Sequence, residues 1–298
     1  MAEHVVRLSA PSSREVSHRQ RLWRRYRARP AAVVASIVLA ALILVAVFAN
    51  MLAPHDPTAQ ALSQQLKPPF WLDGGTPDYP LGTDRFGRDM LSRIIYGARV
   101  SLTIGFVAAT LSAMLGVTLG LTAGYFGGLI DRAIMRLSDI QIAFPFLVVA
   151  IAVIAVLGSN LIVLVALLSV AGWVFYARIT RGLTLRLRTI EYVEAARAAG
   201  AGHRRIITQH ILPNVLSPNL VLWTLSIATL ILVESSLSFL GLGVQPPTPS
   251  WGNLLSDGRG YIDNAWWIAI FPGLAITATV LAVNTLGDAL RDILDPRL

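Results

Sequence analysis

Long apolar runs recur along the chain with shorter polar segments between them, and this alternation limits the possible folds more than any other feature. Hydrophobic residues make up 54% and charged residues 14% of the 298 residues, against about 25% charged residues in a soluble domain. Roughly 20 apolar residues in a helix cross a bilayer. We therefore expect an all-α integral membrane protein with six transmembrane helices. The expected spans are 31–53, 100–125, 140–157, 161–179, 220–242 and 266–286.

The polar segments divide the chain into four parts. Residues 1–30 form an Arg-rich tail, 31–53 the first span, 54–99 a proline-rich loop outside the membrane, and 100–298 a core of five spans. In the tail, the basic and aromatic residues at 19–29 fit an amphipathic helix lying on the membrane surface, or equally a disordered tail that only sets orientation.

The distribution of positive charge predicts the orientation. Segments 1–30, 126–139, 180–219 and 287–298 carry most of the 25 Lys and Arg residues, and cytoplasmic loops are enriched in these residues. Both termini and the polar segment at 181–217 are therefore expected in the cytoplasm. The net charge of +8 fits basic cytoplasmic loops beside lipid, and we expect no nucleic-acid partner.

Several kinds of chemistry are excluded or unsupported. The chain has no cysteine, which excludes disulfides and thiolate metal sites. A phosphate-binding loop requires Gly-Lys-Ser/Thr, but the single lysine, Lys67, lies between Leu66 and Pro68. Any ATP hydrolysis must therefore come from another polypeptide. The five histidines are scattered without metal-ligand spacing. We expect a non-catalytic chain without a cofactor.

The second span carries small residues at regular spacing. Gly116, Gly120 and Gly124 recur at every fourth position, so they share one helix face. Small residues on such a face allow another helix to approach closely inside a membrane. This span is expected to face protein along that stripe.

The cytoplasmic polar segment at 181–217 has an internal pattern of its own. Strong helix formers run from Glu191 to Ala199 and stop at Gly200, a typical helix C-terminus. A second helical stretch runs to Pro213, where we expect it to end because proline cannot continue a helix. Two short helices broken by a glycine between apolar spans indicate a docking surface.

The residues of this segment resemble the EAA loop of ABC-importer permeases. The match consists of Glu194, Ala195 and Ala196, then Gly200, then Leu212-Pro213, with His210 where the general pattern has Ile. In that family the first helix of the loop docks on a cytosolic ATPase. The resemblance implies that Glu194, Ala195, Ala196, Gly200, Leu212 and Pro213 couple to the ATPase, together with Glu191 one turn before Glu194.

Three further segments are similar to dipeptide, oligopeptide and nickel permeases, and 234–252 in particular to their C-type subunit. They are 80–102, 234–252 and 288–298. The resemblance implies the six-helix MetI-like ABC permease fold in the bacterial inner membrane. It also implies a B-type permease as partner, two ABC ATPase subunits that bind ATP, and an extracytoplasmic substrate-binding protein. The implied cargo is a di- or oligopeptide, with nickel, glutathione or heme as alternatives.

Two other groups of residues have alternative interpretations. Glu234 is the one acid deep inside an expected span. Burying an ionisable side chain in a membrane costs free energy, so such a residue is a candidate for a functional site. With Ser235 and Ser238 it fits a gate or path, or a structural role bonded to neighbouring serines. On the outer side, mixed charges and a proline-rich loop fit internal ion pairing or contact with the binding protein. The candidates for that contact are Asp84, Arg88, Pro247 and Trp251.

Two other protein classes remain as alternatives. A secondary transporter or channel would act without an ATPase and would need more intramembrane charges than one glutamate. A receptor or scaffold would have no need of a glycine-broken helix pair in the cytoplasm. Co-purification with an ATPase and a second permease distinguishes the importer from both.

Overall fold

The computed structural model describes residues 26, 27 and 29–294, and helices make up most of this part of the chain. The expected surface helix at 19–29 falls largely outside the described residues. The helical segments are α2 (Pro30–Val47), α3 (Ala49–Leu52), η1 (Leu62–Gln64), α4 (Met90–Phe126), α5 (Gly128–Ala143), α6 (Phe146–Leu157), α7 (Leu161–Leu187), α8 (Glu191–Ala198), α9 (His203–Arg205), the π-helical turn η2 (Ile206–Ile211), α10 (Leu212–Phe239), α11 (Trp251–Gly258), η3 (Arg259–Tyr261) and α12 (Trp267–Leu294).

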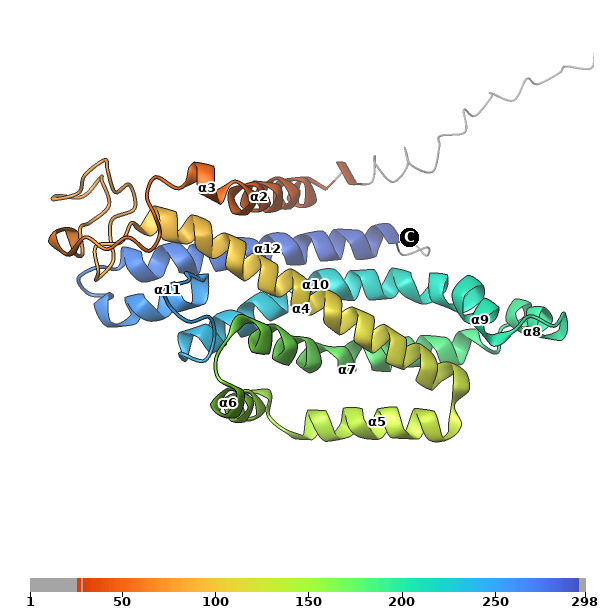
Figure 1. Ribbon diagram of the computed structural model, residues 1–298. Helices are drawn as coiled ribbons and strands as arrows, with labels where there is room; N and C mark the ends of the chain where they lie inside the picture. The colour runs from red at the N-terminus through yellow and green to blue at the C-terminus, as the bar shows by residue number, and fades with distance from the viewer. Residues whose placement is uncertain (1–25, 28, 295–298) are drawn as a thin grey trace, which may run out of the picture.

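The described residues contain five helices that are long and apolar enough to cross a membrane, or six if a bent pair counts as one span. The five are α2, α4, α7, the continuous 203–239 helix and α12. In Figure 1, α4, α7, α10 and α12 extend along the long axis of the molecule, with α11 near one end and α8 and α9 at the other. The predicted all-α membrane fold is confirmed.

The third predicted span is the bent pair, in which α5 and α6 meet at 90°. Pro145 explains the bend, because it disfavours helical geometry at Phe144, whose backbone is extended. The prediction of a short loop at 126–139 was wrong, since α5 already begins at Gly128. Its acids pair with α7: Arg178 donates to Asp139 at 2.6 Å, and Arg181 forms an ion pair with Asp131.

The predicted small-residue stripe is confirmed as a close helix contact between α4 and α7. A Cβ atom on Gly120 would lie 2.5 Å from the carbonyl oxygen of Ala177, and one on Gly124 would lie 2.7 Å from Cβ of Thr184. Gly116 leaves similarly little room against Trp173. Backbone therefore lies against side chain and backbone along this face, with no space for a larger residue.

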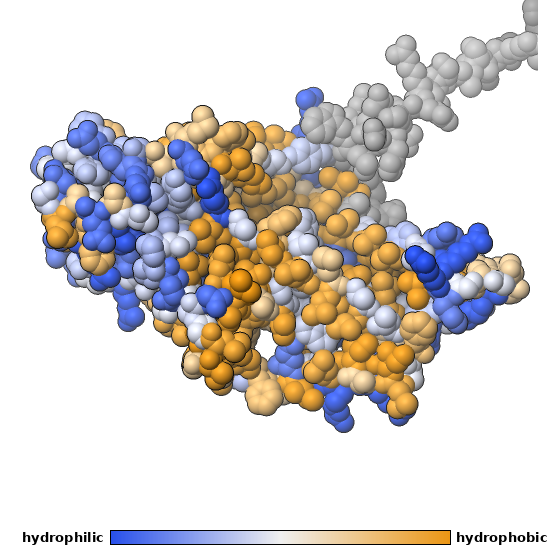
Figure 2. Space-filling model, viewed as in Figure 1, coloured by the Kyte–Doolittle hydropathy of each residue, from blue (hydrophilic) through white to orange (hydrophobic). Residues whose placement is uncertain are grey.

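The two ends of the helical body are polar and its middle is apolar. Figure 2 shows an orange belt between a blue region around the outer loops and a blue region at α8 and α9. The end opposite α8 includes α11, which lies between the expected spans 220–242 and 266–286. Leu254 of α11 is buried and its neighbour Trp251 is fully enclosed. Burial of these apolar side chains explains why this segment is helical.

Candidate functional site

Helix α8 projects one polar face from the end of the molecule that the charge distribution predicts to be cytoplasmic. Glu191 and Glu194 lie in its first turn and Arg197 in its last, an arrangement that complements the helix dipole. Val193 is the buried residue of this helix, whereas Glu191, Glu194 and Ala195 are exposed and Ala196 is half-buried. The outward face is therefore the one that carries Glu191, Glu194 and Ala195.

Gly200 ends α8 in a left-handed conformation with φ +85°. The N–H of Gly200 donates to the Arg197 carbonyl at 3.0 Å and that of Ala201 to the Ala196 carbonyl at 3.0 Å. These two bonds form a Schellman cap, which favours glycine at this position. The predicted helix stop at Gly200 is confirmed, and its cause is the backbone conformation.

Val193 anchors α8 on the membrane helices. It is fully buried in a cluster with Tyr125 of α4, Ile206 and Ile211 of the π-helical turn and Val215 of α10. Leu212, one of the predicted coupling residues, packs on the edge of the same cluster. The inward face of α8 thus joins, through one apolar side chain, a buried cluster to which two long helices contribute.

Polar contacts reinforce the connection to α4. The hydroxyl of Tyr125 lies 2.8 Å from Nδ1 of His203. Arg188, at the C-terminal end of α7, donates from Nη1 to the carbonyls of Gly124 at 3.0 Å and of Tyr125 at 3.3 Å. A cation beside the last carbonyls of a helix is favourable. Both contacts fix the C-terminal end of α4 to the chain that leads into and out of α8.

The second part of the loop differs from the prediction at Pro213. The helix does not end there, because His203–Phe239 is one continuous span. The π-helical turn lies directly before Pro213 and bonds Leu212 N–H to the carbonyl of Ile207. Its wider spacing makes room for the ring that would clash in a regular α-helix. Pro213 itself is exposed.

Glu234 lies at the centre of a buried hydroxyl network. Its side chain is 0% exposed and accepts a hydrogen bond from Ser238 at 2.6 Å. Ser101 of α4 and Ser235 donate at 3.4 Å, and Ser101 also accepts from the N–H of Trp251 at 3.2 Å. The carboxylate therefore links α4, α10 and the start of α11, an arrangement that fits the structural interpretation.

The outer charged residues form an internal ion-pair cluster. Asp84 accepts from Nε of Arg88 at 2.6 Å and from Arg93. Asp257 of α11 lies 3.4 Å from Arg88 and 3.3 Å from Arg93. The cluster ties the outer loop to α11 and matches the internal-pairing interpretation.

Burial bears on the four candidates for binding-protein contact. The side chains of Asp84, Arg88 and Trp251 are buried, so they offer no surface to an incoming protein in this conformation. For these three, burial favours contacts within the chain. Pro247 is exposed and stays a candidate.

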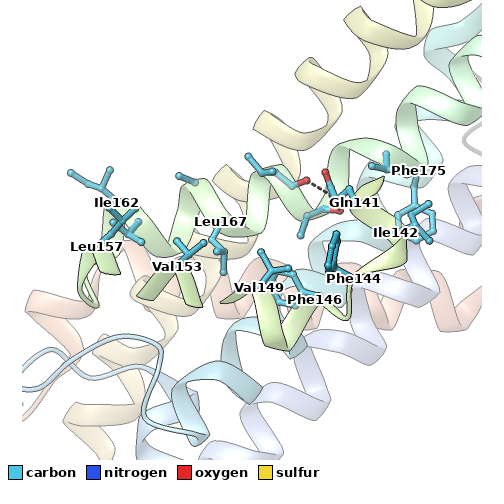
Figure 3. Close-up of a pocket in the computed structure, with 15 residues that line it drawn as sticks. Gln141, Ile142, Phe144, Phe146, Val149, Val153, Leu157, Ile162, Leu167 and Phe175 are labelled. Atoms are coloured by element: carbon cyan, nitrogen blue, oxygen red, sulfur yellow. Dashed lines mark hydrogen bonds between the residues drawn. The ribbon is translucent and has the colours of Figure 1, made fainter. Parts of the chain in front are cut away.

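An apolar groove of about 480 Å³ lies between α5, α6 and α7 (Figure 3). Its polar wall is Gln141, whose amide nitrogen donates to the Val170 carbonyl at 2.7 Å and whose oxygen accepts from Trp173 at 2.7 Å. Both ends of this amide are therefore used within the chain. The groove offers apolar contact and has little means of selecting a polar ligand.

Several contact residues of the site could not be identified from the sequence. Val193, Tyr125, His203 and Arg188 belong to no motif, and their roles depend on contacts between distant segments. A partial signal existed in Val193, the one β-branched apolar residue on an otherwise polar and alanine-rich helix.

The described residues thus form a bundle of helices that are long and apolar enough to span a membrane, with the exposed helix α8 at one end. The chain belongs to the family described as binding-protein-dependent transport system inner membrane component, whose model matches residues 116–298. The model for the N-terminal TM domain of oligopeptide transport permease C matches residues 17–69.

Curated relatives match over nearly the whole chain. The di/tripeptide transport system permease protein DppC of Pseudomonas aeruginosa is 42% identical over 100% of this chain and 98% of its own length. Its counterpart in Haemophilus influenzae, named for dipeptide transport, is 42% identical over 94% of this chain and 95% of its own. The glutathione transport system permease protein GsiD of Escherichia coli is 45% identical over 93% of this chain and 89% of its own.

A solved structure supports the fold. A chain of the inward-facing MetNI methionine ABC transporter aligns with TM-score 0.55 and 21% identity, covering 69% of this chain and 98% of that one. This likeness confirms the MetI-like permease fold. The family places the chain among multi-pass inner-membrane proteins that serve transport.

Proposed function

We propose that the chain is the C-type permease subunit of an ABC importer for peptides. It would form the path with a B-type permease, above two ATPase subunits and below a substrate-binding protein. The names of the relatives support peptide cargo. Glutathione is the second candidate, because the relative named for glutathione transport is equally similar.

The observation that carries the proposal is the geometry of α8. Its outward face presents Glu191, Glu194 and Ala195, while Val193 is buried against α4 and the start of α10. Small alanine side chains keep the helix narrow enough to enter a groove, and the acids can pair with basic residues there. The exposed side of α8 is free to bind an ATPase subunit, and its buried side is packed against the cluster formed by α4 and α10. Movement of the ATPase can therefore be transmitted through α8 to these two helices.

The mechanism follows from these contacts. Closure of the ATPase subunits moves α8, and Val193 transmits the movement to α4 and α10. Tilting of these helices changes the path between inward- and outward-open states, which is alternating access by rigid-body motion. In this proposal the ATP is bound and hydrolysed by the partners, this chain holds no cofactor, and both its termini lie in the cytoplasm.

The test is charge reversal on α8 in the complete transporter, purified with its partners and reconstituted in vesicles. Glu194→Lys is expected to abolish ATP-driven peptide uptake, whether or not assembly of the complex is also weakened. The matched control is Asp263→Lys, which reverses an exposed acid at the opposite end of the molecule. Normal uptake and normal stimulation of ATP hydrolysis with Glu194→Lys would refute the role of α8.

A further inference from the structure

Three consecutive apolar side chains are exposed on the outer loop. Phe70 is 56% exposed, Trp71 49% and Leu72 37%, although they lie in a polar region outside the expected spans. An exposed run of this kind is unfavourable in water and indicates a surface that is covered by something apolar.

The backbone holds this apolar run in a fixed position. The N–H of Leu72 donates to the Pro69 carbonyl at 2.9 Å, and that of Gly75 donates to the Leu72 carbonyl at 2.9 Å. A Cβ atom on Gly75 would clash with the backbone of Pro69, so the turn is tightly closed. The three side chains are thus presented by a compact turn.

Aromatic contacts place the turn at the outer end of a membrane-spanning helix. The Trp71 ring lies 6.1 Å from that of Phe271 in an edge-on arrangement, and Phe271 lies 5.7 Å from Trp266. Trp267, the first residue of α12, donates from Nε1 to the Thr83 carbonyl at 3.0 Å. The loop is therefore fastened to the start of α12.

The apolar surface continues from this turn down α12. Ile270, Leu274 and Leu281 are exposed on one face of the helix, spaced so that they point in similar directions. Trp71 thus lies next to the first turn of a mainly apolar face, in which the hydroxyl of the exposed Thr277 donates to the Gly273 carbonyl at 2.8 Å.

We propose that Phe70, Trp71 and Leu72 form an interfacial anchor that inserts into the outer leaflet of the lipid bilayer. Tryptophan and other aromatic side chains favour the depth of the lipid headgroups, and this cluster lies where α12 enters the membrane. Continuity with the apolar face of α12 favours lipid over a water-soluble protein as the occupant. The anchor depends on the membrane orientation alone and not on the proposed transport activity.

The chain has no cysteine, so single labels can be placed cleanly. In the full-length protein, Leu72→Cys carries a bimane fluorophore, and Asp78→Cys, an exposed position of the same loop, serves as control. Both are placed in nanodiscs of phosphatidylethanolamine and phosphatidylglycerol that contain doxyl-labelled phosphatidylcholine. Iodide is the aqueous quencher, and nanodiscs expose both membrane faces to it.

The label at Leu72→Cys is expected to emit at shorter wavelength than the control, to be quenched by the doxyl lipid and to lose its quenching by iodide. Adding Phe70→Ser and Trp71→Ser to the Leu72→Cys variant should restore iodide quenching, with the emission of the Asp78→Cys control unchanged by the same two substitutions. Equal iodide quenching at both positions would overturn the proposal. So would shielding at Leu72→Cys that appears only when a sister permease or binding protein is added.

Discussion

The hydroxyl of Tyr125 lies 2.8 Å from Nδ1 of His203, and this contact joins the last turn of α4 to the first residue of the helix that follows α8. Tyr125 also belongs to the buried cluster beneath α8 that contains Val193. Apolar and polar contacts therefore converge on a single side chain. Movement of α8 and α9 together, without movement of α4, would disturb both contacts.

Tyr125→Phe removes the hydrogen bond and keeps the packing of the ring. The loss of one such bond costs about 1 kcal/mol, so the transporter is expected to assemble and hydrolyse ATP. The amount of peptide taken up per ATP hydrolysed should fall severalfold, because movement of the loop is coupled more weakly to α4. Reconstituted vesicles in which uptake and hydrolysis are measured together provide the readout. Tyr261→Phe at the outer end is the control, and a coupling ratio equal for both variants would contradict the prediction.

Gly200→Ala tests the backbone conformation at the end of α8. No atom lies within 4 Å of the position a Cβ would occupy, but φ is +85°, so the expected cost of about 1–2 kcal/mol comes from the left-handed conformation alone. Faster proteolytic cleavage between α8 and α9 and weaker coupling should follow. Gly202→Ala is a matched control, since it has equally open space and an ordinary φ of −69°. Equal effects at both glycines would count against this explanation.

Gly120→Ala tests the close contact of α4 with α7. A Cβ there would lie 2.5 Å from the Ala177 carbonyl oxygen, and overpacking of this kind costs about 1–3 kcal/mol. Thermal unfolding of the purified protein in detergent should show a lower midpoint. Gly182→Ala on α7 meets no atom within 4 Å and should leave the midpoint unchanged or raise it. A Gly120→Ala protein as stable as Gly182→Ala would show that the helices are farther apart.

Glu234→Gln separates the structural role of this residue from a role of its charge. Glutamine keeps an acceptor for Ser238 and gains a donor for the other hydroxyls, so assembly and transport are both expected to persist. Glu234→Leu leaves Ser101 and Ser238 without this partner, and the yield of folded protein should drop. Size-exclusion profiles and uptake assays check both variants. An assembled Glu234→Gln transporter without uptake would instead assign the charge to the path.

Asp84→Asn weakens the outer ion-pair cluster. Asp84 is 0% exposed and accepts from Arg88 and Arg93, so its loss leaves two buried cations with Asp257 as their remaining acid. Breaking a buried pair in this way costs about 3–5 kcal/mol. The thermal midpoint is expected to fall well below that of Asp73→Asn, an exposed acid of the same loop. Similar midpoints for the two variants would show that the cluster contributes little.

The sequence predicts the spans well because bilayer thickness sets their length and composition. Prediction was weaker for segments whose secondary structure depends on tertiary contacts. Segment 128–139 is helical, with acids that pair with Arg178 and Arg181 of α7, and α11 contains the enclosed Trp251 and Leu254. Neither set of partners can be identified from local pattern.

The coupling loop shows the same limit. Gly200 was predicted from local chemistry, because a left-handed residue at a helix end favours glycine. Pro213 was predicted as an end on the same grounds and is instead part of a continuous helix, since a π-helical turn accommodates it. Val193 and Tyr125 meet across distant parts of the chain, and single-sequence reasoning has no access to such pairs.

The glycine stripe on α4 limits how the bundle can move. At Gly116, Gly120 and Gly124, the backbone of α4 lies directly against backbone and side-chain atoms of α7. At these three positions, no flexible side chain of α4 separates the two helices. For one helix to slide along the other, the distance between α4 and α7 would first have to increase. We therefore expect α4 and α7 to move as one rigid unit. Bending is expected at the residues that follow α4, such as Gly127 and Gly128, which have left-handed backbone conformations.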